Sequence, residues 1–257
     1  MSIDLVTKLI DNYNLEDKHI GLILNSIISR LNFVPFPETC KKYNFLNNFF
    51  PNLAEELRIK LVDLLQRLLN KYTNELIPVM SDLSSMIAKL LTDAFPDIKN
   101  KLSEFLIQLS AKLNKVLGPH SKSIITSLCS NLKHAHNKIR KVTVLALVEV
   151  LLCEIAGKFF EETIPFMKLL SNDKNYDVRK AFYASVFRLL TNFNIIYLRK
   201  YEHNLVLFLM NGLSDEKEDV QVMCLDYLEQ AGEYRKRLAE ELEEDVGDIN
   251  SQMQVDN

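Results

Sequence analysis

The sequence predicts an all-α fold, an α-solenoid of about five to six stacked helix pairs. Three observations support this prediction. A helix-start pattern, an aliphatic residue followed by a cation or an amide, recurs five times along the 257 residues. The apolar residues that follow each start fall on one face of a helix. Helix-breaking residues are scarce, at 6 Gly and 7 Pro, whereas 47% of the chain is hydrophobic, which is enough to bury a long core.

The five helix starts are nearly evenly spaced, at intervals of 41, 41, 39 and 42 residues. A period of about 40 residues is typical of HEAT and armadillo arrays, in which each repeat contains a pair of packed helices. We therefore expect HEAT-like helix pairs whose second helices line one layer. These second helices are expected to begin near Leu57, Ile98, Ile139, Val178 and Val220.

Each second helix is expected to bury one apolar face. Counted from the aliphatic residue, offsets 0, 4, 8 and 11 lie on the same side of a helix with 3.6 residues per turn. These offsets are almost always aliphatic or aromatic in the five segments. The residues at offset 8, for example, are Leu65, Leu106, Leu147, Val186 and Leu228.

Two further positions recur in every repeat. The cation position follows the aliphatic residue and holds Arg58, Lys99, Arg140, Arg179 and Gln221. The turn position lies six residues earlier, between the paired helices, and holds Asn52, Asp93, His134, Asp173 and Asp215. An acid there can accept hydrogen bonds from backbone N–H groups at the next helix start, and it can face the Arg or Lys of an adjoining repeat.

The prolines favour HEAT repeats among the helical repeats. Pro165 falls early in the first helix of its repeat, where a kinked outer helix places it. Pro78 has a similar place, but its distance from the next start predicts a longer first helix. Residues 22–31 are expected to form the outer helix of an irregular first repeat, in which Pro35 and Pro37 follow. The expected domains are N-terminal helices with the first repeat at 1–52, a HEAT array at 53–245, and a disordered acidic and polar tail at 246–257.

Composition argues against several classes of function. The net charge of −3 disfavours general binding to nucleic acid or a membrane surface, because phosphate binding needs a cationic face. No apolar run is long enough to span a membrane, and the start of the chain lacks the features of a signal peptide. The expected location is therefore cytoplasmic.

Cofactor, metal and catalytic sites are not expected. The four cysteines are widely spaced and are expected to be buried thiols. His134 and His136 form an H-x-H pair near Cys129, but at a helix-to-turn junction the two rings are expected to point in different directions. Gly is too scarce for a phosphate loop or a dinucleotide fold. No acid or nucleophile accompanies the histidines at a catalytic spacing, which predicts a protein that is not an enzyme.

Basic side chains cluster at several helix starts. Solvated repeat faces are the ordinary explanation of such clusters. Because the cation positions recur on successive inner helices, a narrow basic strip for an acidic partner is also a possible interpretation. The residues of this candidate partner-binding strip are Lys99, Arg140, Lys141, Arg179 and Lys180.

Four segments carry a resemblance to a known family: residues 127–140 (SLCSNLKHAHNKIR), 162–166 (ETIPF), 177–181 (DVRKA) and 207–216 (LFLMNGLSDE). They resemble the central array of the axonemal dynein assembly factors of the HEAT-repeat type. The resemblance implies a cytoplasmic, non-catalytic factor that helps to preassemble outer and inner dynein arms. Its implied partners are dynein intermediate chains together with chaperones.

Two alternatives stand beside this interpretation. The repeats by themselves imply only an extended protein-binding surface, as in a generic HEAT adaptor of the transport-receptor or phosphatase-scaffold kind. A helical hydrolase with an unrecognised site is the alternative from the enzyme class. A strongly perturbed acid or histidine in a closed pocket would favour that alternative.

Overall fold

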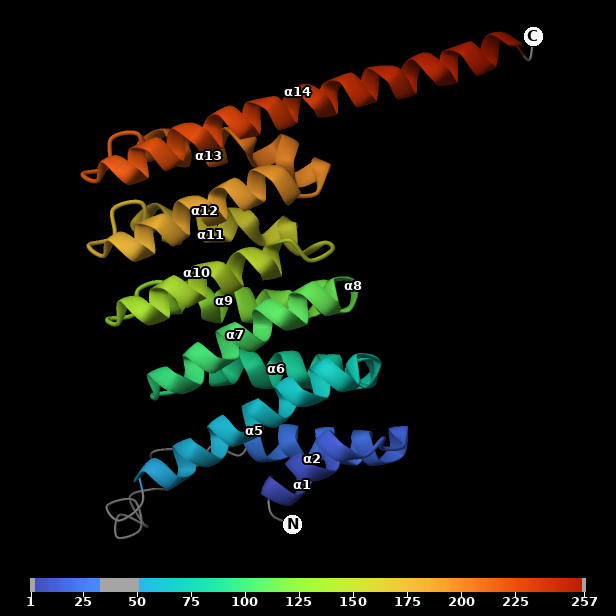
Figure 1. Ribbon diagram of the computed structural model, residues 1–257, viewed down its shortest axis with the longest axis vertical. Coiled ribbons are helices and arrows are strands. Elements are labelled where there is room, and N and C mark those ends of the chain that lie inside the picture. Colours follow the sequence, from blue (N-terminus) through green and yellow to red (C-terminus); the bar gives the residue numbers. More distant parts are fainter. Residues whose placement is uncertain (1–2, 33–50, 256–257) are drawn as a thin grey trace. The chain divides into compact units, whose positions relative to one another are not determined.

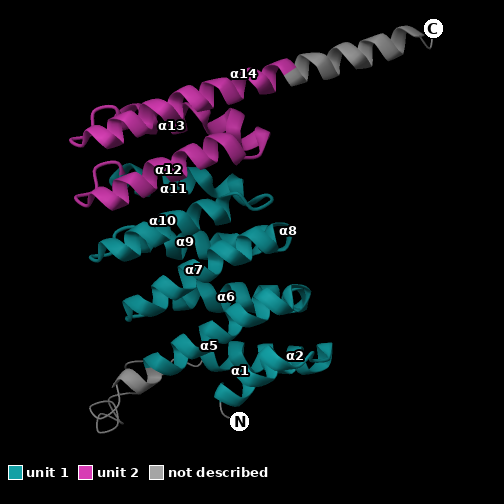
Figure 2. Ribbon diagram, in the orientation of Figure 1, with its two compact units in different colours: residues 1–170 teal, residues 171–257 magenta. Residues whose placement is uncertain are grey.

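A computed structural model of the chain describes residues 3–32 and 51–255, with side chains described for residues 3–32 and 55–240. Within these ranges the regular structure is helical and contains no strand. The chain divides into two compact units, residues 1–170 and 171–257 (Figure 2). The all-α solenoid predicted from the periodicity is confirmed.

Unit 1 consists of two layers of helices (Figure 1). In the layer of first helices, α2 packs on α6, α6 on α9 and α9 on α11. In the layer of second helices, α5 packs on α7 and α7 on α10. The α-helices of this unit are α1 Ile3–Asn12, α2 Asp17–Asn32, α5 Pro51–Lys71, α6 Met80–Leu90, α7 Pro96–Lys112, α8 Asn114–Leu117, α9 Ser121–Asn131, α10 Asn137–Leu151 and α11 Phe160–Leu170.

Unit 2 contains three long helices, α12 Tyr176–Asn192, α13 Ile195–Gly212 and α14 Glu218–Val255. The second helices α12 and α14 pack on each other, and α13 packs on both. Gly212 allows α13 to approach α14 closely. A Cβ atom at this position would lie 2.3 Å from Cys224 Sγ and 3.1 Å from Tyr183 Cε1.

Four of the five predicted helix starts are confirmed. Ile98, Ile139, Val178 and Val220 are each the third residue of their helices, α7, α10, α12 and α14, and all four are buried. Leu57 is the exception, because α5 begins at Pro51 and Leu57 is 44% exposed within it. The register of α5 is nevertheless the expected one, since the residues at offsets 4, 8 and 11 are buried: Leu61, Leu65 and Leu68.

The outer helices correct one prediction. Pro165 lies inside α11, as expected, and α2 includes residues 22–31. Pro78, however, does not lengthen the first helix of its repeat, because α6 spans 11 residues, the same number as α9 and α11. The preceding residues form a 3₁₀ helix, Thr73–Val79. Proline lacks a backbone N–H and disfavours α conformation in the residue before it, so the α-helix starts only after Pro78.

The predicted domain boundaries remain predictions. Pro35 and Pro37 lie outside the described residues, as do the side chains of the expected tail at 246–257.

Candidate functional site: the cation and turn positions

The acids at the turn position shape the turns between paired helices. The carboxylate of each accepts a hydrogen bond from the backbone N–H two residues later, as in an Asx turn. Asp93 Oδ1 accepts from Phe95 N at 2.9 Å, Asp173 Oδ1 from Asn175 N at 2.8 Å and Asp215 Oδ1 from Lys217 N at 2.9 Å. The predicted contact between these acids and the next helix start is confirmed.

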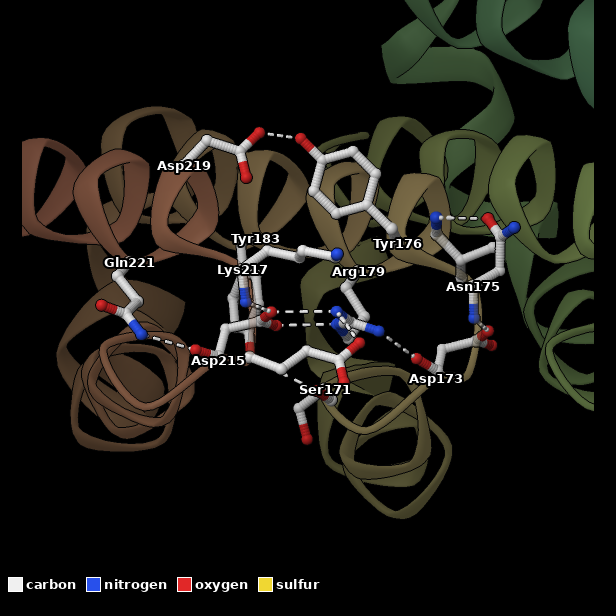
Figure 3. A network of polar contacts seen from close by, with 12 residues as sticks. Ser171, Asp173, Asn175, Tyr176, Arg179, Tyr183, Asp215, Lys217, Asp219 and Gln221 are labelled. Carbon is white, nitrogen blue, oxygen red and sulfur yellow. Dashed lines mark hydrogen bonds and ion pairs between the residues drawn. The ribbon is translucent and has the colours of Figure 1, made fainter.

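Arg179 joins two successive repeats of unit 2 (Figure 3). Its guanidinium donates to both carboxylate oxygens of Asp215, from Nε to Oδ2 at 2.7 Å and from Nη2 to Oδ1 at 2.9 Å. Nη1 donates to the carbonyl of Asp173, six residues earlier, at 2.8 Å, and Nη2 also reaches Glu216 Oε1 at 2.9 Å. The Arg179 and Asp215 side chains are 6% and 3% exposed. The predicted pairing of an acid with the cation of an adjoining repeat is therefore confirmed here, in a buried setting.

The electrostatics of this pair favour both charged forms. Burial by itself would raise the pKa of Asp215. The hydrogen bonds from Arg179 and Lys217 N–H, together with the charges of both residues, outweigh burial and hold that pKa below its ordinary value. The Arg179 pKa is raised, mainly by its hydrogen bonds to Asp215. The pair is therefore ionised at neutral pH and links α12 to the turn before α14.

A looser pair occupies the same positions at the start of unit 1. Arg58 Nη2 lies 3.4 Å from Asp93 Oδ1, and Arg58 Nε lies 3.3 Å from Asp93 Oδ2. The Nε group does not have the alignment of a hydrogen bond. The guanidinium carbon also lies 5.2 Å from the centre of the Phe95 ring, at a distance typical of a cation–π contact.

The next pair of positions in unit 1 holds Lys99 and His134. Lys99 is half-buried, and its side chain has no hydrogen bond or ion pair within the described residues. Burial lowers the Lys99 pKa, and the charge of Asp93 offsets this only in part. Burial lowers the His134 pKa as well, and electrostatic interactions with Lys99, His136 and Arg140 lower it further. These shifts indicate that the cations lie close enough to His134 to repel its protonated form.

The two histidines of the H-x-H pair do not diverge as expected. Their ring centroids are 5.3 Å apart, because the turn brings residues 134 and 136 to the same side. His134 Nδ1 accepts a hydrogen bond from His136 N at 3.1 Å, the bond that the aspartates make in the other turns. Among the described residues, no group of three or more His, Cys, Asp or Glu is placed to hold a metal ion.

The candidate partner-binding strip is divided between the two units. Lys99, Arg140 and Lys141 belong to unit 1, and Arg179 and Lys180 belong to unit 2. Arg179 is buried in the pair described above, whereas Lys141 is exposed. Arg140 Nη1 donates to the carbonyl of His134 at 2.8 Å, and Lys180 Nζ lies 3.5 Å from Asp219 Oδ2. Whether these residues bind a partner stays a prediction.

Sequence reasoning missed the contact between the cation position and the backbone. Arg140, Arg179 and Gln221 each donate to the carbonyl six residues earlier, at 2.6–2.8 Å. The constant spacing of six residues between the two positions is the signal that could have revealed this bond. It ties these three helix starts to their own turns, whether or not an acid is present.

The cysteines of the described residues are buried thiols, as predicted. Burial raises the pKa of Cys129 and Cys224 to about 12 and that of Cys153 to about 11. Cys40 lies outside the described residues. The part of the chain that the structure describes also has no helix with both the length and the apolar composition needed to cross a bilayer.

Comparison with solved structures agrees with the fold. One crystal structure of computationally designed armadillo repeat proteins for modular peptide recognition matches 83% of this chain and 99% of its own. The TM-score is 0.50 at 18% sequence identity, so this likeness concerns the fold alone.

Comparison of sequences gives a narrower result. Dynein axonemal assembly factor 5 of Xenopus laevis is 25% identical over 196 residues. The match covers 76% of this chain and 23% of the Xenopus protein, so the chain spans about a quarter of that relative's length. Residues 1–248 match the family described as dynein axonemal assembly factor 5-like, TPR repeats. Because this match extends over nearly the whole sequence, the chain belongs to the dynein axonemal assembly factor 5-like family.

Proposed function

We propose that this chain is a non-catalytic scaffold that acts in the cytoplasmic preassembly of axonemal outer and inner dynein arms. The observation that carries the proposal is the family match over residues 1–248, together with the name of the Xenopus relative. The chain corresponds to 23% of that relative, so its contribution is proposed for this part of the array.

The proposed partners are dynein intermediate chains, held together with chaperones. Large multi-chain assemblies expose apolar surface until their subunits meet, and such surface is prone to aggregation. A layer of parallel helix starts can hold a partner segment through many weak contacts, without any chemical step. In unit 1, the proposed contact residues are Lys99, Arg140 and Lys141, which carry positive charge at successive helix starts.

The displaced pKa values of the described residues support a non-catalytic role. Burial raises the pKa values of Cys129, Cys153 and Cys224, so these thiols are poor nucleophiles at neutral pH. The lowered Asp215 pKa belongs to a carboxylate already bound by Arg179. The pKa shifts of the thiols arise from burial in the core, and that of Asp215 arises from its ion pair between repeats. None of these groups combines an accessible nucleophile with an adjacent base.

Deleting the gene in a ciliated or flagellated host tests this proposal. We expect intact microtubule doublets with reduced outer and inner dynein arms, and reduced cytoplasmic levels of dynein heavy and intermediate chains. Re-expression of the wild-type chain should restore the arms. Normal arms and normal motility in the deletion strain would contradict the dynein role and leave the generic adaptor function.

A further inference from the structure

The cation position of one repeat pairs with an acid at the turn position of the next. In unit 1, Arg58 lies 3.3 Å from Asp93, and in unit 2, Arg179 lies 2.7 Å from Asp215. In both pairs the acid side chain is almost completely buried, at 4% and 3% exposed. The acid therefore has two tasks, since it also accepts a backbone N–H of its own turn.

His134 performs only one of these two tasks. Its Nδ1 accepts the backbone N–H of His136, as the aspartates do in the other turns. An imidazole nitrogen that accepts an N–H carries no proton, so the proton of the neutral ring lies on Nε2. The neutral ring supplies no negative charge to the cation of the preceding repeat. In the turn between α9 and α10 (Figure 1), His134 therefore forms no ion pair with the cation of the preceding repeat.

Lys99 is the cation left without its acid. Its ammonium group makes no hydrogen bond or ion pair within the described residues, although Lys99 as a whole is half-buried. Asp93, the acid that acts on it electrostatically, is already paired with Arg58. A half-buried ammonium group gains free energy from an anion that replaces part of its lost hydration.

Two hydrogen-bond donors of this site therefore have no partner in the described residues, Lys99 Nζ and His134 Nε2. They come from adjoining repeats, because α7 and α10 pack on each other and His134 lies just before α10. An ammonium group and an imidazole N–H can together bind the two oxygens of one carboxylate. The positive charge of Lys99, which acts on His134, favours the approach of an anion.

We propose that Lys99 and His134 form a docking site for an acidic segment of a protein partner, whose Asp or Glu carboxylate pairs with Lys99 as Asp93 pairs with Arg58 and Asp215 with Arg179. This inference rests on the proposed scaffold function, in that the ligand is a protein. The partner supplies the acid that this repeat lacks, so docking adds an ion pair of the type already present elsewhere in the same chain.

A peptide-binding experiment with a matched set of variants tests the inference. The probe is a fluorescein-labelled oligoglutamate peptide, followed by fluorescence anisotropy at low and moderate salt, with an oligoserine peptide as the uncharged comparison. His134→Asp places an acid in the site, and Lys99→Met removes the ammonium group while keeping most of the side-chain volume. His203→Asp on α13 makes the same side-chain exchange at an exposed position outside the site.

The wild-type chain is expected to bind oligoglutamate in a salt-sensitive manner and not to bind oligoserine. His134→Asp and Lys99→Met should each weaken binding by about tenfold or more, as expected for the loss of charge-assisted hydrogen bonds. His203→Asp should bind as the wild type does. His134→Asp should also melt at a higher temperature than the wild type, so lost binding there does not reflect unfolding.

Three results would overturn the inference: no binding of oligoglutamate to the wild type, unchanged binding by His134→Asp, or a lower melting temperature of that variant. The outcome is independent of the gene-deletion experiment. Suppose that peptide binding depends on Lys99 and His134, but that a strain without the gene has normal dynein arms. The binding site would then be supported and the dynein role refuted.

Discussion

Unit 1 and unit 2 place different side chains at equivalent positions of the same repeat. In unit 2, Arg179 and Asp215 form a buried ion pair with two parallel hydrogen bonds. In unit 1, Lys99 and His134 stand at the same positions without forming a pair. The backbone turn is present in both, because an aspartate or an imidazole can each accept the N–H that closes it. The difference shows that the repeat geometry does not depend on the ion pair.

The Arg58–Asp93 pair is intermediate between these two. Its nitrogen–oxygen distances, 3.3 and 3.4 Å, are longer than those of Arg179–Asp215. The Arg58 guanidinium also makes a cation–π contact with the Phe95 ring. Removal of one partner from a closed and buried pair destabilises its unit, whereas an unpaired cation remains accessible to another molecule. Stability and binding are therefore expected to respond in opposite ways to changes at the two sites.

The largest expected difference between the two sites is in stability. Arg179→Met removes one partner of a buried pair and leaves the Asp215 carboxylate without its counter-charge, which should cost about 3–5 kcal/mol. Lys99→Met removes a cation that has no acid partner and should change stability by less than about 1 kcal/mol. Urea unfolding of the two variants measures both values. Equal losses would mean that the Arg179 pair has no special structural role.

Acid should weaken unit 2 through Asp215. The pKa of this carboxyl group is lower in the folded state, so the unfolded chain binds a proton more readily there. The stabilisation is present above the unfolded-state pKa and is lost as the pH falls through the lowered folded-state pKa. Asp215→Asn should already be less stable than the wild type at neutral pH. As the pH is lowered, its urea midpoint should therefore fall less steeply than that of the wild type. Parallel profiles would contradict this account.

The buried thiols report separately on the two units. Cys224 lies in α14 of unit 2, whereas Cys129 and Cys153 lie in unit 1. In Arg179→Met, iodoacetamide should label Cys224 faster by about tenfold or more, because local opening of unit 2 becomes less costly. Labelling of the two unit 1 thiols should change little. Mass spectrometry of the labelled peptides distinguishes the sites, and equal acceleration at all three would show that the units do not open separately.

Much of this arrangement could be predicted from spacing. The period of about 40 residues indicated the helix pairs, and the offsets within each second helix indicated the buried columns. The turn position also predicted the pairing of Asp215 with a cation of an adjoining repeat, because helix starts of successive repeats lie side by side. The family resemblance, carried by residues 127–140 and three shorter segments, is confirmed by the family match.

Other features depend on neighbours that a repeat pattern does not specify. Arg179 and Lys99 both stand at the cation position of their repeats. The Arg179 side chain is nevertheless 6% exposed and bound by two acids, whereas Lys99 is unpaired. Leu57 follows the pattern and is still 44% exposed, because burial depends on what covers a residue. The turn also brings the His134 and His136 rings to 5.3 Å, a local conformation that alternation along the chain does not reveal.

His134 occupies the turn position, at which Asp93 and Asp215 pair with the cation of the preceding repeat; an acid at residue 134 should therefore pair with Lys99. A double-mutant cycle of the wild type, His134→Asp, Lys99→Met and the double variant tests it most directly, with urea unfolding free energies as the measurement. His134→Asp should stabilise the chain by about 0.5–1 kcal/mol, and most of this gain should disappear when Lys99 is absent. A coupling energy of zero, or a destabilised His134→Asp variant, would contradict the account.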